Sequence, residues 1–334
     1  MKNPRIAVVG ATGVVGETLL RILEERGFPC ADMLPLASAR SAGSKIRFRD
    51  KDWLVEVASP DSFGGVDLVF FAATGALSKT LAPEAVKRGA LVIDKSSTWR
   101  MDPMVPLVVP EINADAILSE PGIIACPNCS TIGVVQALQP VHQLAGLKSL
   151  VVTTMQAASG SGAPGLEELQ AQVAGATASN VSIFPRILHN NVVPQCGSFL
   201  ESGATDEEMK LVHETRKIMS LPELEIAATC VRVPVEVGHS ASIYLETREP
   251  VSVEQVHSAI ESHPGTQVMD NPSTQLYPIP DDAVGQDDVF IGRVRVDEQN
   301  PRKLWLWQVG DNLRKGAATN AVQIAEAWLS NHAL

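Results

Sequence analysis

Three glycines at a regular spacing follow the first apolar run of this chain. Residues 6–9 have the composition of a buried strand, Gly10, Gly13 and Gly16 come next, and residues 17–26 show the apolar spacing of a helix. Glycine permits a sharp turn and lets the backbone approach a diphosphate at the start of a helix. Because this triplet both follows a strand and opens a helix, it predicts a dinucleotide-binding unit. A tight turn without a ligand is the alternative.

The end of the second expected strand indicates which dinucleotide would bind. In NAD sites an acidic residue at this position binds the ribose hydroxyls. Residues 33–37 are followed instead by Ser38, Arg40 and Ser41. An arginine between two hydroxyl groups suits a 2′-phosphate, and we therefore expect NADP. The alternative is an arginine that is merely solvated.

Strand and helix patterns then alternate. Residues 66–72 and 90–93 are expected strands, and residues 78–88 are the helix between them. Such alternation predicts a parallel sheet with right-handed crossovers, in which ligands collect at the carboxyl ends of the strands. Polar segments at 96–100 and 128–129 also follow expected strands, so we expect them at the same edge as the glycine turn.

Cys129 stands between an apolar run, residues 121–127, and a helix pattern over residues 130–139 that we expect to end at Pro140. The start of a helix favours a negative charge, so a thiol there ionises readily and can act as a nucleophile. A buried core cysteine is the alternative. Cys126 forms a C-x-x-C with it, which leaves a redox pair or a regulatory disulfide open. The sequence offers no second ligand pair for a structural zinc site, and we expect no metal.

Composition argues against several classes of function. The 334 residues carry a net charge of −11, with 45% hydrophobic and 19% charged residues. This charge is unsuited to nucleic acid or an anionic membrane surface, since both attract basic faces. No apolar stretch approaches the ~20 residues of a membrane span, and the N-terminus leaves no room for a signal peptide. Five scattered cysteines are typical of a reducing compartment, so we expect a cytoplasmic protein.

The second half of the chain has a different pattern. A strand is expected at 150–156, and it leads into a loop rich in serine and glycine. Residues 225–234 and 239–247 alternate in polarity and are expected to be antiparallel strands joined by a short turn. This arrangement would put Arg232 and His239 on neighbouring strand ends. Among the seven histidines, only His239 follows a glycine at the start of an expected strand and is expected near an arginine, Arg232.

A helix is expected after Thr205, which suits the N-cap position, with Glu208 completing a capping box. Glu207 and Lys210 are three residues apart and therefore share one side of this helix. On the residues alone, an ordinary surface ion pair is the favoured interpretation of these two side chains.

Taken together, these segments resemble the aspartate-β-semialdehyde dehydrogenase family, and the resemblance covers nearly the whole chain. The number and order of the matching segments make it specific. They are Gly-Ala-Thr-Gly-x-Val-Gly at 10–16, Ser-Ala-Arg-Ser-Ala-Gly at 38–43, Ser-Ser-x-x-Arg at 96–100, Pro-Asn-Cys-Ser-Thr at 127–131, Gln156 before the Ser-Gly loop, Glu-Glu-Met-Lys at 207–210, Arg-Val-Pro at 232–234, Gly238-His239, and Asp-Asn-Leu-Arg-Lys-Gly-Ala-Ala at 311–318.

The resemblance implies reductive dephosphorylation of L-aspartyl-4-phosphate by NADPH, which gives L-aspartate-4-semialdehyde. This reaction serves the biosynthesis of lysine, threonine, methionine and diaminopimelate. Cys129 would attack the acyl phosphate and hold a thioester, His239 would act as general acid and base, and Gln156 would orient the acyl group. The resemblance also implies a homodimer formed through the second domain.

The resemblance further implies the binding residues. Arg232 would pair with the substrate α-carboxylate, and Glu207 would meet the α-ammonium group, which overturns the surface-pair interpretation. The residues implied to hold the phosphate are Arg100, Asn128 and Lys210. The expected cofactor contacts are Gly10, Thr12, Gly13, Val14, Val15, Ser38, Arg40, Ser41, Ser159, Gly160 and Asn312.

The patterns and the resemblance together predict an α/β chain. A Rossmann-like dinucleotide-binding domain would comprise residues 1–128 with a C-terminal helix at about 312–334. An α+β catalytic and dimerisation domain with a mixed, largely antiparallel sheet would comprise residues 129–311. Two alternatives stay open. One is a related acyl-phosphate reductase such as N-acetyl-γ-glutamyl-phosphate reductase, which prefers a glycine where this chain has Asn128. The other is a non-catalytic nucleotide-binding paralogue.

Overall fold

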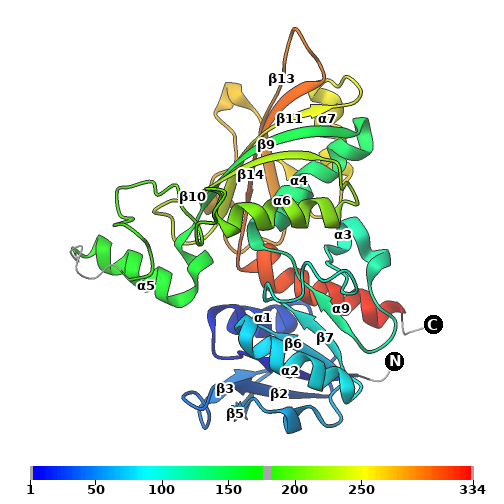
Figure 1. Ribbon diagram of the computed structural model, residues 1–334, viewed down its shortest axis with the longest axis vertical. Coiled ribbons are helices and arrows are strands. Elements are labelled where there is room, and N and C mark those ends of the chain that lie inside the picture. Colours follow the sequence, from blue (N-terminus) through cyan, green and yellow to red (C-terminus); the bar gives the residue numbers. More distant parts are fainter. Residues whose placement is uncertain (1–2, 176–181, 332–334) are drawn as a thin grey trace. The chain divides into compact units, whose positions relative to one another are not determined.

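The computed structural model describes residues 3–175 and 182–331. The chain divides into two compact units, one of residues 1–128 with 317–334 and the other of residues 129–316 (Figure 1). The last three residues of the expected C-terminal helix lie outside the described residues. Each unit has a six-stranded sheet of its own.

The first unit contains a sheet in which every pair of neighbouring strands is parallel. Its strand order is β5–β2–β1–β6–β7–β8. The chain therefore builds outward from β1 on one side and returns to its other side at β6, which is the switch point of a Rossmann-like fold. The strands are β1 (Arg5–Val9), β2 (Asp32–Ala37), β5 (Glu56–Val57), β6 (Leu68–Phe71), β7 (Leu91–Asp94) and β8 (Ile123–Ala125).

Helices cover both faces of this sheet, because successive residues of a strand point to opposite faces. Ile6 and Val8 pack in a core with residues of α1 (Val14–Glu25) and α9 (Thr319–Asn331). Ala7 and Val9 pack in a second core with residues of α2 (Gly75–Lys87). A strand buried on both faces is expected to be a continuous apolar run, and β1 is apolar and buried from Ile6 to Val9. The short helix α3 (Pro110–Asn113) also belongs to this unit.

The first unit also contains a two-stranded hairpin that was not predicted, formed by β3 (Lys45–Phe48) and β4 (Lys51–Leu54). Its turn is formed by Arg49 and Asp50, whose φ angles are 53° and 59°. Tight hairpin turns with positive φ usually contain asparagine or glycine. The usual sequence signal is therefore absent here.

The expected end of a helix at Pro140 is wrong. Helix α4 runs from Cys129 to Ala145, with Pro140 inside it. A proline removes one helix hydrogen bond and disfavours the helix by about 3 kcal/mol. Val141 and Ala145 beyond it are buried, and burial of one valine side chain contributes about 1.5–3 kcal/mol. Packing of the last turn therefore offsets much of the effect of the proline.

The second unit contains a mixed sheet of order β10–β9–β11–β14–β13–β12. The pairs β9·β11, β11·β14 and β13·β14 are antiparallel, and β9·β10 and β12·β13 are parallel. The expected fold class is therefore confirmed for this unit as for the first. The strands are β9 (Leu147–Gln156), β10 (Glu225–Arg232), β11 (His239–Thr247), β12 (Thr266–Val268), β13 (Val289–Val296) and β14 (Lys303–Gly310).

The expectation that residues 225–234 and 239–247 lie side by side is wrong. β10 and β11 run in opposite directions, but β9 lies between them and pairs with both. Alternating polarity identifies a strand and the face that it buries, but it does not identify the neighbouring strand. A strand about 70 residues earlier in the chain fills the gap.

Helices α4, α6 (Asp206–Ile218) and α7 (Val253–Ser262) form the helical layer of this unit, and α5 (Gly162–Val173) stands apart from them (Figure 1). α4 contacts strands β9, β11, β13 and β14, and α6 contacts β10. A further short helix, α8 (Pro280–Ala283), contacts β14. Across the described parts of both units, no helix combines the length and apolarity needed to cross a membrane.

Candidate active site

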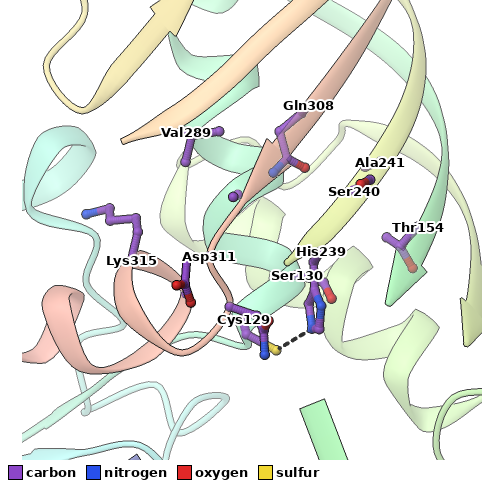
Figure 2. Close-up of a pocket in the computed structure, with 14 residues that line it drawn as sticks. Cys129, Ser130, Thr154, His239, Ser240, Ala241, Val289, Gln308, Asp311 and Lys315 are labelled. Atoms are coloured by element: carbon purple, nitrogen blue, oxygen red, sulfur yellow. Dashed lines mark hydrogen bonds between the residues drawn. The ribbon is translucent and has the colours of Figure 1, made fainter. Parts of the chain in front are cut away.

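Cys129 and His239 meet at one edge of the second unit. Cys129 is the first residue of α4, and His239 is the first residue of β11. Although 110 residues separate them in the sequence, Cys129 Sγ lies 3.3 Å from His239 Nε2, as the dashed line in Figure 2 shows. Cys129 is half-buried and His239 is buried. A thiol and an imidazole are therefore within hydrogen-bond reach of each other, which is the arrangement that nucleophilic catalysis by cysteine needs.

The local backbone explains both positions. The positive end of the α4 dipole favours a thiolate on Cys129. β11 begins directly after Gly238, whose φ of 99° lies in the left-handed region. A Cβ on Gly238 would lie 2.9 Å from Pro280 Cβ. Any other residue would therefore displace the chain where it enters His239.

One backbone amide determines which nitrogen of His239 carries the proton. The Ala157 amide donates a hydrogen bond to His239 Nδ1 at 3.1 Å. Because an amide N–H only donates, Nδ1 holds a lone pair, and the proton of the neutral ring is on Nε2, facing the sulfur. Burial and, next, the positive charge of Arg232 lower the pKa of His239 to about 3. At neutral pH the uncharged ring therefore presents an N–H group to Cys129.

Arg232 reaches the same edge from β10. It ends this strand in register with Gln156, the last residue of β9. Arg232 Nη1 donates to the Ala157 carbonyl oxygen at 2.6 Å, and the guanidinium lies 5.8 Å from the centre of the Phe184 ring. Because β11 is antiparallel to β9, it begins where β9 ends. Arg232, Gln156 and His239 therefore share one sheet edge.

Helix α6 brings charged side chains to Gln156. Gln156 Nε2 donates to Ser130 Oγ, and to Glu207 Oε1 at 3.2 Å. Lys210 Nζ lies 3.3 Å from Glu207 Oε2 and 2.6 Å from Asp206 Oδ2. Burial lowers the pKa of Lys210, but the Asp206 hydrogen bond and the charges of both carboxylates raise it overall. The expected ion pair is therefore present, and it also contacts the edge that carries Cys129 and His239.

Gly160 and Asn312, two of the expected cofactor contacts, border this site. Asn312 Oδ1 accepts a hydrogen bond from the Gly238 amide at 2.9 Å and lies 3.1 Å from Ser159 Oγ. A Cβ on Gly160 would lie 2.8 Å from Arg232 Nη1 and 3.2 Å from His239 Nε2. Asn312 thus joins the two loops beside His239, and Gly160 leaves room for the side chains that would carry out the reaction.

A cavity of about 10 Å³ lies beside Cys129, which is room for about one water molecule. Figure 2 shows Lys315 and Asp311 near its wall. Lys315 is 1% exposed. Asp311 Oδ1 accepts from the Leu313 and Arg314 amides, and its Oδ2 accepts from the Gly285 amide. Asp311 therefore organises the backbone of the segment that carries Lys315.

The glycine turn of the first unit fits a dinucleotide. Gly10 has a φ of 86°, and a Cβ there would lie 2.3 Å from the Ala72 carbonyl oxygen. A Cβ on Gly16 would lie 2.2 Å from the Gly10 carbonyl oxygen. Gly13 is the N-cap of α1, and no side chain caps the helix there. The amides at the start of α1, including those of Val14 and Val15, can therefore face a diphosphate.

The segment that was expected to select the cofactor follows β2. Ser38 and Arg40 are exposed and Ser41 is half-buried. Within residues 3–175 and 182–331, the Arg40 side chain makes no ion pair. It is therefore accessible to an anionic ligand.

Arg100 and Asn128 follow β7 and β8 of the parallel sheet, and both are buried. Arg100 Nη2 donates to the Lys95 carbonyl oxygen at 2.9 Å. These two residues belong to the first unit, whereas Lys210, the third residue expected to hold phosphate, belongs to the second.

Two family models match the chain. Residues 5–120 match the NAD binding domain of semialdehyde dehydrogenase, and residues 138–315 match its dimerisation domain. A curated relative, aspartate-semialdehyde dehydrogenase of Bacillus subtilis, is 48% identical over 96% of both chains. The chain belongs to the aspartate-semialdehyde dehydrogenase family. The family expected from the sequence motifs is thus confirmed, and the chain is an oxidoreductase with a nicotinamide-dinucleotide-binding domain.

Solved structures of the family agree with the fold. Aspartate semialdehyde dehydrogenase II from Vibrio cholerae, described as complexed with ASA, has a TM-score of 0.95, is 41% identical, and is covered over 99% of both chains. Aspartate semialdehyde dehydrogenase with NADP from Candida albicans has a TM-score of 0.76 and 25% identity, and 99% of each chain is covered.

Two groups that contact the site residues were not predicted from the sequence. One is the Ala157 amide, because a backbone donor leaves no signal in residue type. The other is Phe184, which lies in a segment without regular secondary structure. Its only sequence signal is that it is a large aromatic residue in a stretch rich in polar residues and proline.

Proposed function

We propose that this chain catalyses the NADPH-dependent reductive dephosphorylation of L-aspartyl-4-phosphate through a thioester on Cys129. The products are L-aspartate-4-semialdehyde, phosphate and NADP⁺, and the reaction runs in both directions. The observation that carries the proposal is the 3.3 Å approach of Cys129 Sγ to His239 Nε2. The relative from Vibrio cholerae described as complexed with ASA supports the choice of substrate.

Cys129 carries out the covalent step. Its thiolate attacks the acyl carbon, a carbon–sulfur bond forms, and the carbon–oxygen bond to phosphate breaks. The thioester that results accepts hydride more readily than a carboxylate would. A dinucleotide held at the start of α1 would supply this hydride. Collapse of the reduced adduct then breaks the carbon–sulfur bond, releases the aldehyde and restores the thiolate.

His239 assists through its Nε2–H group. In the resting enzyme this group donates to the sulfur and favours the thiolate. Once the sulfur is acylated, the same group can donate to the oxygen on which charge develops during attack and reduction. The hydrogen bond from the Ala157 amide holds Nδ1 as an acceptor throughout, so His239 acts first as a donor and takes back only the proton that it gives.

The remaining residues hold the substrate. Arg232 is the partner of the α-carboxylate, and Glu207 is the partner of the α-ammonium group. Gln156, hydrogen-bonded to Glu207, orients the acyl group. Arg100, Asn128 and Lys210 hold the phosphate.

NADP is the proposed cofactor. Gly10, Thr12, Gly13, Val14 and Val15 would hold its diphosphate at the start of α1. Ser38, Arg40 and Ser41 would hold the 2′-phosphate. Ser159, Gly160 and Asn312 would hold the nicotinamide end. The relative from Candida albicans, described with NADP, supports this choice over NAD.

A homodimer in the cytoplasm completes the proposal. Val151, Tyr244 and Trp305 stand opposite one another on β9, β11 and β14, with the Tyr244 and Trp305 ring centres 5.1 Å apart. Val151 is 49% exposed. A partly exposed apolar row on the sheet of a dimerisation domain supports a second copy as its partner. The charged variant Val151→Glu should sediment as a monomer, whereas an unchanged dimer would place the interface elsewhere.

Reduction of NADP⁺ in the presence of aspartate semialdehyde and phosphate tests the proposed reaction. We expect turnover that depends on all three components. Turnover with N-acetylglutamate semialdehyde but not with aspartate semialdehyde would contradict the proposal. Binding of NADPH without turnover on either aldehyde would indicate a non-catalytic paralogue.

A further inference from the structure

A buried carboxylate on α5 holds a segment that has no regular secondary structure. Glu168 is 7% exposed. Its Oε2 accepts hydrogen bonds from the Ser182 and Ile183 amides at 2.8 and 2.7 Å, and its Oε1 accepts from the Phe184 amide at 3.3 Å. Three successive amides on one carboxylate fix the path of the backbone at these residues.

Gln172 lies one turn farther along α5 and repeats this arrangement. Its Nε2 donates to Glu168 Oε1 at 3.1 Å. Its Oε1 accepts from the Leu188 and His189 amides at 2.8 and 3.0 Å. Residues 182–189 are therefore attached to α5 at both ends by side-chain acceptors.

This attachment determines the position of the Phe184 ring. The ring is 5% exposed and packs in a cluster with Leu169 and Ala158. Phe184 Cζ lies 3.3 Å from the position that a Cβ on Gly165 would occupy, so α5 approaches the tip of the ring closely. The ring consequently has little freedom to shift while Glu168 holds its backbone.

Arg232 contacts the Phe184 ring through its guanidinium group. Its guanidinium carbon lies 5.8 Å from the ring centre, within the range of a cation–π contact. Its backbone exchanges two hydrogen bonds with Val193, and its Nη1 donates to the Ala157 carbonyl oxygen. The backbone and one end of the side chain are thus held by hydrogen bonds, and the Phe184 ring is a further contact of the guanidinium group. A carboxylate is bound by two parallel donors of a guanidinium plane.

We infer that Phe184 is a positioning residue that orients Arg232 toward the substrate α-carboxylate, and that Glu168 holds Phe184 in place. Substrate selection for an α-carboxylate thereby depends on a side chain that contacts no substrate. This inference rests on the role proposed for Arg232.

The test compares two aldehydes in the complete enzyme. Aspartate semialdehyde has the α-carboxylate, and 3-aminopropanal is the same molecule without it. We expect Phe184→Leu to raise the KM for aspartate semialdehyde about tenfold, which corresponds to about 1.4 kcal/mol of a desolvated cation–π contact. We expect kcat to change less than about twofold, and kcat/KM for 3-aminopropanal and the KM for NADP⁺ to stay unchanged.

Glu168→Gln provides a second variant, because it places an NH₂ group against amides that need an acceptor. We expect the same selective rise in the KM for aspartate semialdehyde, at about threefold or more. Glu167→Gln is the matched control, since Glu167 neighbours it on α5 and is exposed. It should leave both aldehydes within about twofold of the parent enzyme.

Arg232→Lys separates this inference from the proposed function. If Arg232→Lys reduces the preference for aspartate semialdehyde but neither Phe184→Leu nor Glu168→Gln does, the inference is wrong and the role of Arg232 stands. Equal losses on both aldehydes in the two variants would show a general structural effect and would also overturn the inference. If Arg232→Lys leaves the preference unchanged, Arg232 does not bind the carboxylate, and both proposals fail.

Discussion

The two units bring their polar side chains together in different ways. In the first unit all sheet strands are parallel, so their carboxyl ends share one edge, and the residues of this unit that are expected to bind the dinucleotide all lie between Gly10 and Ser41. In the second unit the sheet is mixed. Its site combines the carboxyl ends of β9 and β10 with the amino end of β11. The expected nucleotide contacts of the first unit are therefore close together in the sequence, whereas the proposed catalytic pair of the second unit, Cys129 and His239, depends on long-range topology.

Replacing Cys129, the proposed nucleophile, should distinguish the functions of the two units most sharply: turnover should be lost while dinucleotide binding is kept. We expect Cys129→Ala to lower kcat by at least about 10⁴-fold, because no thioester can form. NADPH binding, measured by fluorescence titration, should change less than about twofold. Cys30→Ala, which changes a cysteine of the first unit, is the control and should keep its turnover. Substantial turnover by Cys129→Ala would remove the nucleophile assignment.

A single added methyl group should show how closely the candidate active site of the second unit is packed. Gly160→Ala places a Cβ 2.8 Å from Arg232 Nη1 and 3.2 Å from His239 Nε2. Displacement of these groups should lower kcat/KM about 100-fold, with little change in Tm.

Gly64→Ala is the control for this packing test, because its Cβ would meet nothing within 4 Å. Near-normal kcat/KM in Gly160→Ala, measured in steady state, would show that the loop gives way and that the packing is not critical.

Cofactor preference tests the local site of the first unit. Arg40→Ala removes the charged donor proposed for the 2′-phosphate, and a hydrogen bond to a charged group contributes about 1.5–3 kcal/mol. The KM for NADP⁺ should therefore rise about 30-fold, while the KM for NAD⁺ stays constant. Arg21→Ala, on the exposed side of α1, should change neither value. Equal effects on both dinucleotides in Arg40→Ala would contradict selection by Arg40.

Protonation of His239 should affect stability at mildly acidic pH. The pKa of this histidine is lowered to about 3 in the folded chain, against about 6.5 in an unfolded chain. The unfolded state therefore binds the proton more readily below about pH 6.5, and folding loses stability as the pH falls. Between pH 7.5 and 5.5 this amounts to about 1.4 kcal/mol in the free energy of unfolding.

Urea unfolding of the parent enzyme and of His239→Gln at these two pH values measures that contribution. The parent should lose about 1.4 kcal/mol more than the variant. A parent that loses less than the variant would mean that His239 is protonated in the fold, as in a thiolate–imidazolium pair.

The sequence carried enough information for the parallel sheet, because alternating strands and helices permit few topologies. Cys129 could be placed at the start of a helix because an apolar run and a helical pattern meet there. Which strands of the second unit lie next to one another could not be predicted so well. Arg232 and His239 do share an edge, but β9 intervenes between their strands, and nothing in alternating polarity encodes the insertion of an earlier strand.

Contacts that no local sequence pattern encodes could not be predicted. The proton on His239 Nε2 is set by the Ala157 amide, and any residue but proline supplies such a donor. Phe184 contacts Arg232 from a segment whose backbone amides, at residues 182–184, are bound by Glu168 of another part of the chain. The helix through Pro140 likewise reflects burial of the following turn rather than local preference. In each case tertiary packing outweighs what the local sequence indicates.

A burst experiment without phosphate tests the thioester most directly. Enzyme mixed with aspartate semialdehyde and NADP⁺ should release about one equivalent of NADPH per Cys129 in a rapid phase and then stop, because the acyl group has no phosphate to leave with. Mass spectrometry of the quenched enzyme should find the aspartyl group on the peptide that contains Cys129. If the parent enzyme shows no rapid phase, or if Cys129→Ala still shows one, covalent catalysis at this sulfur is contradicted.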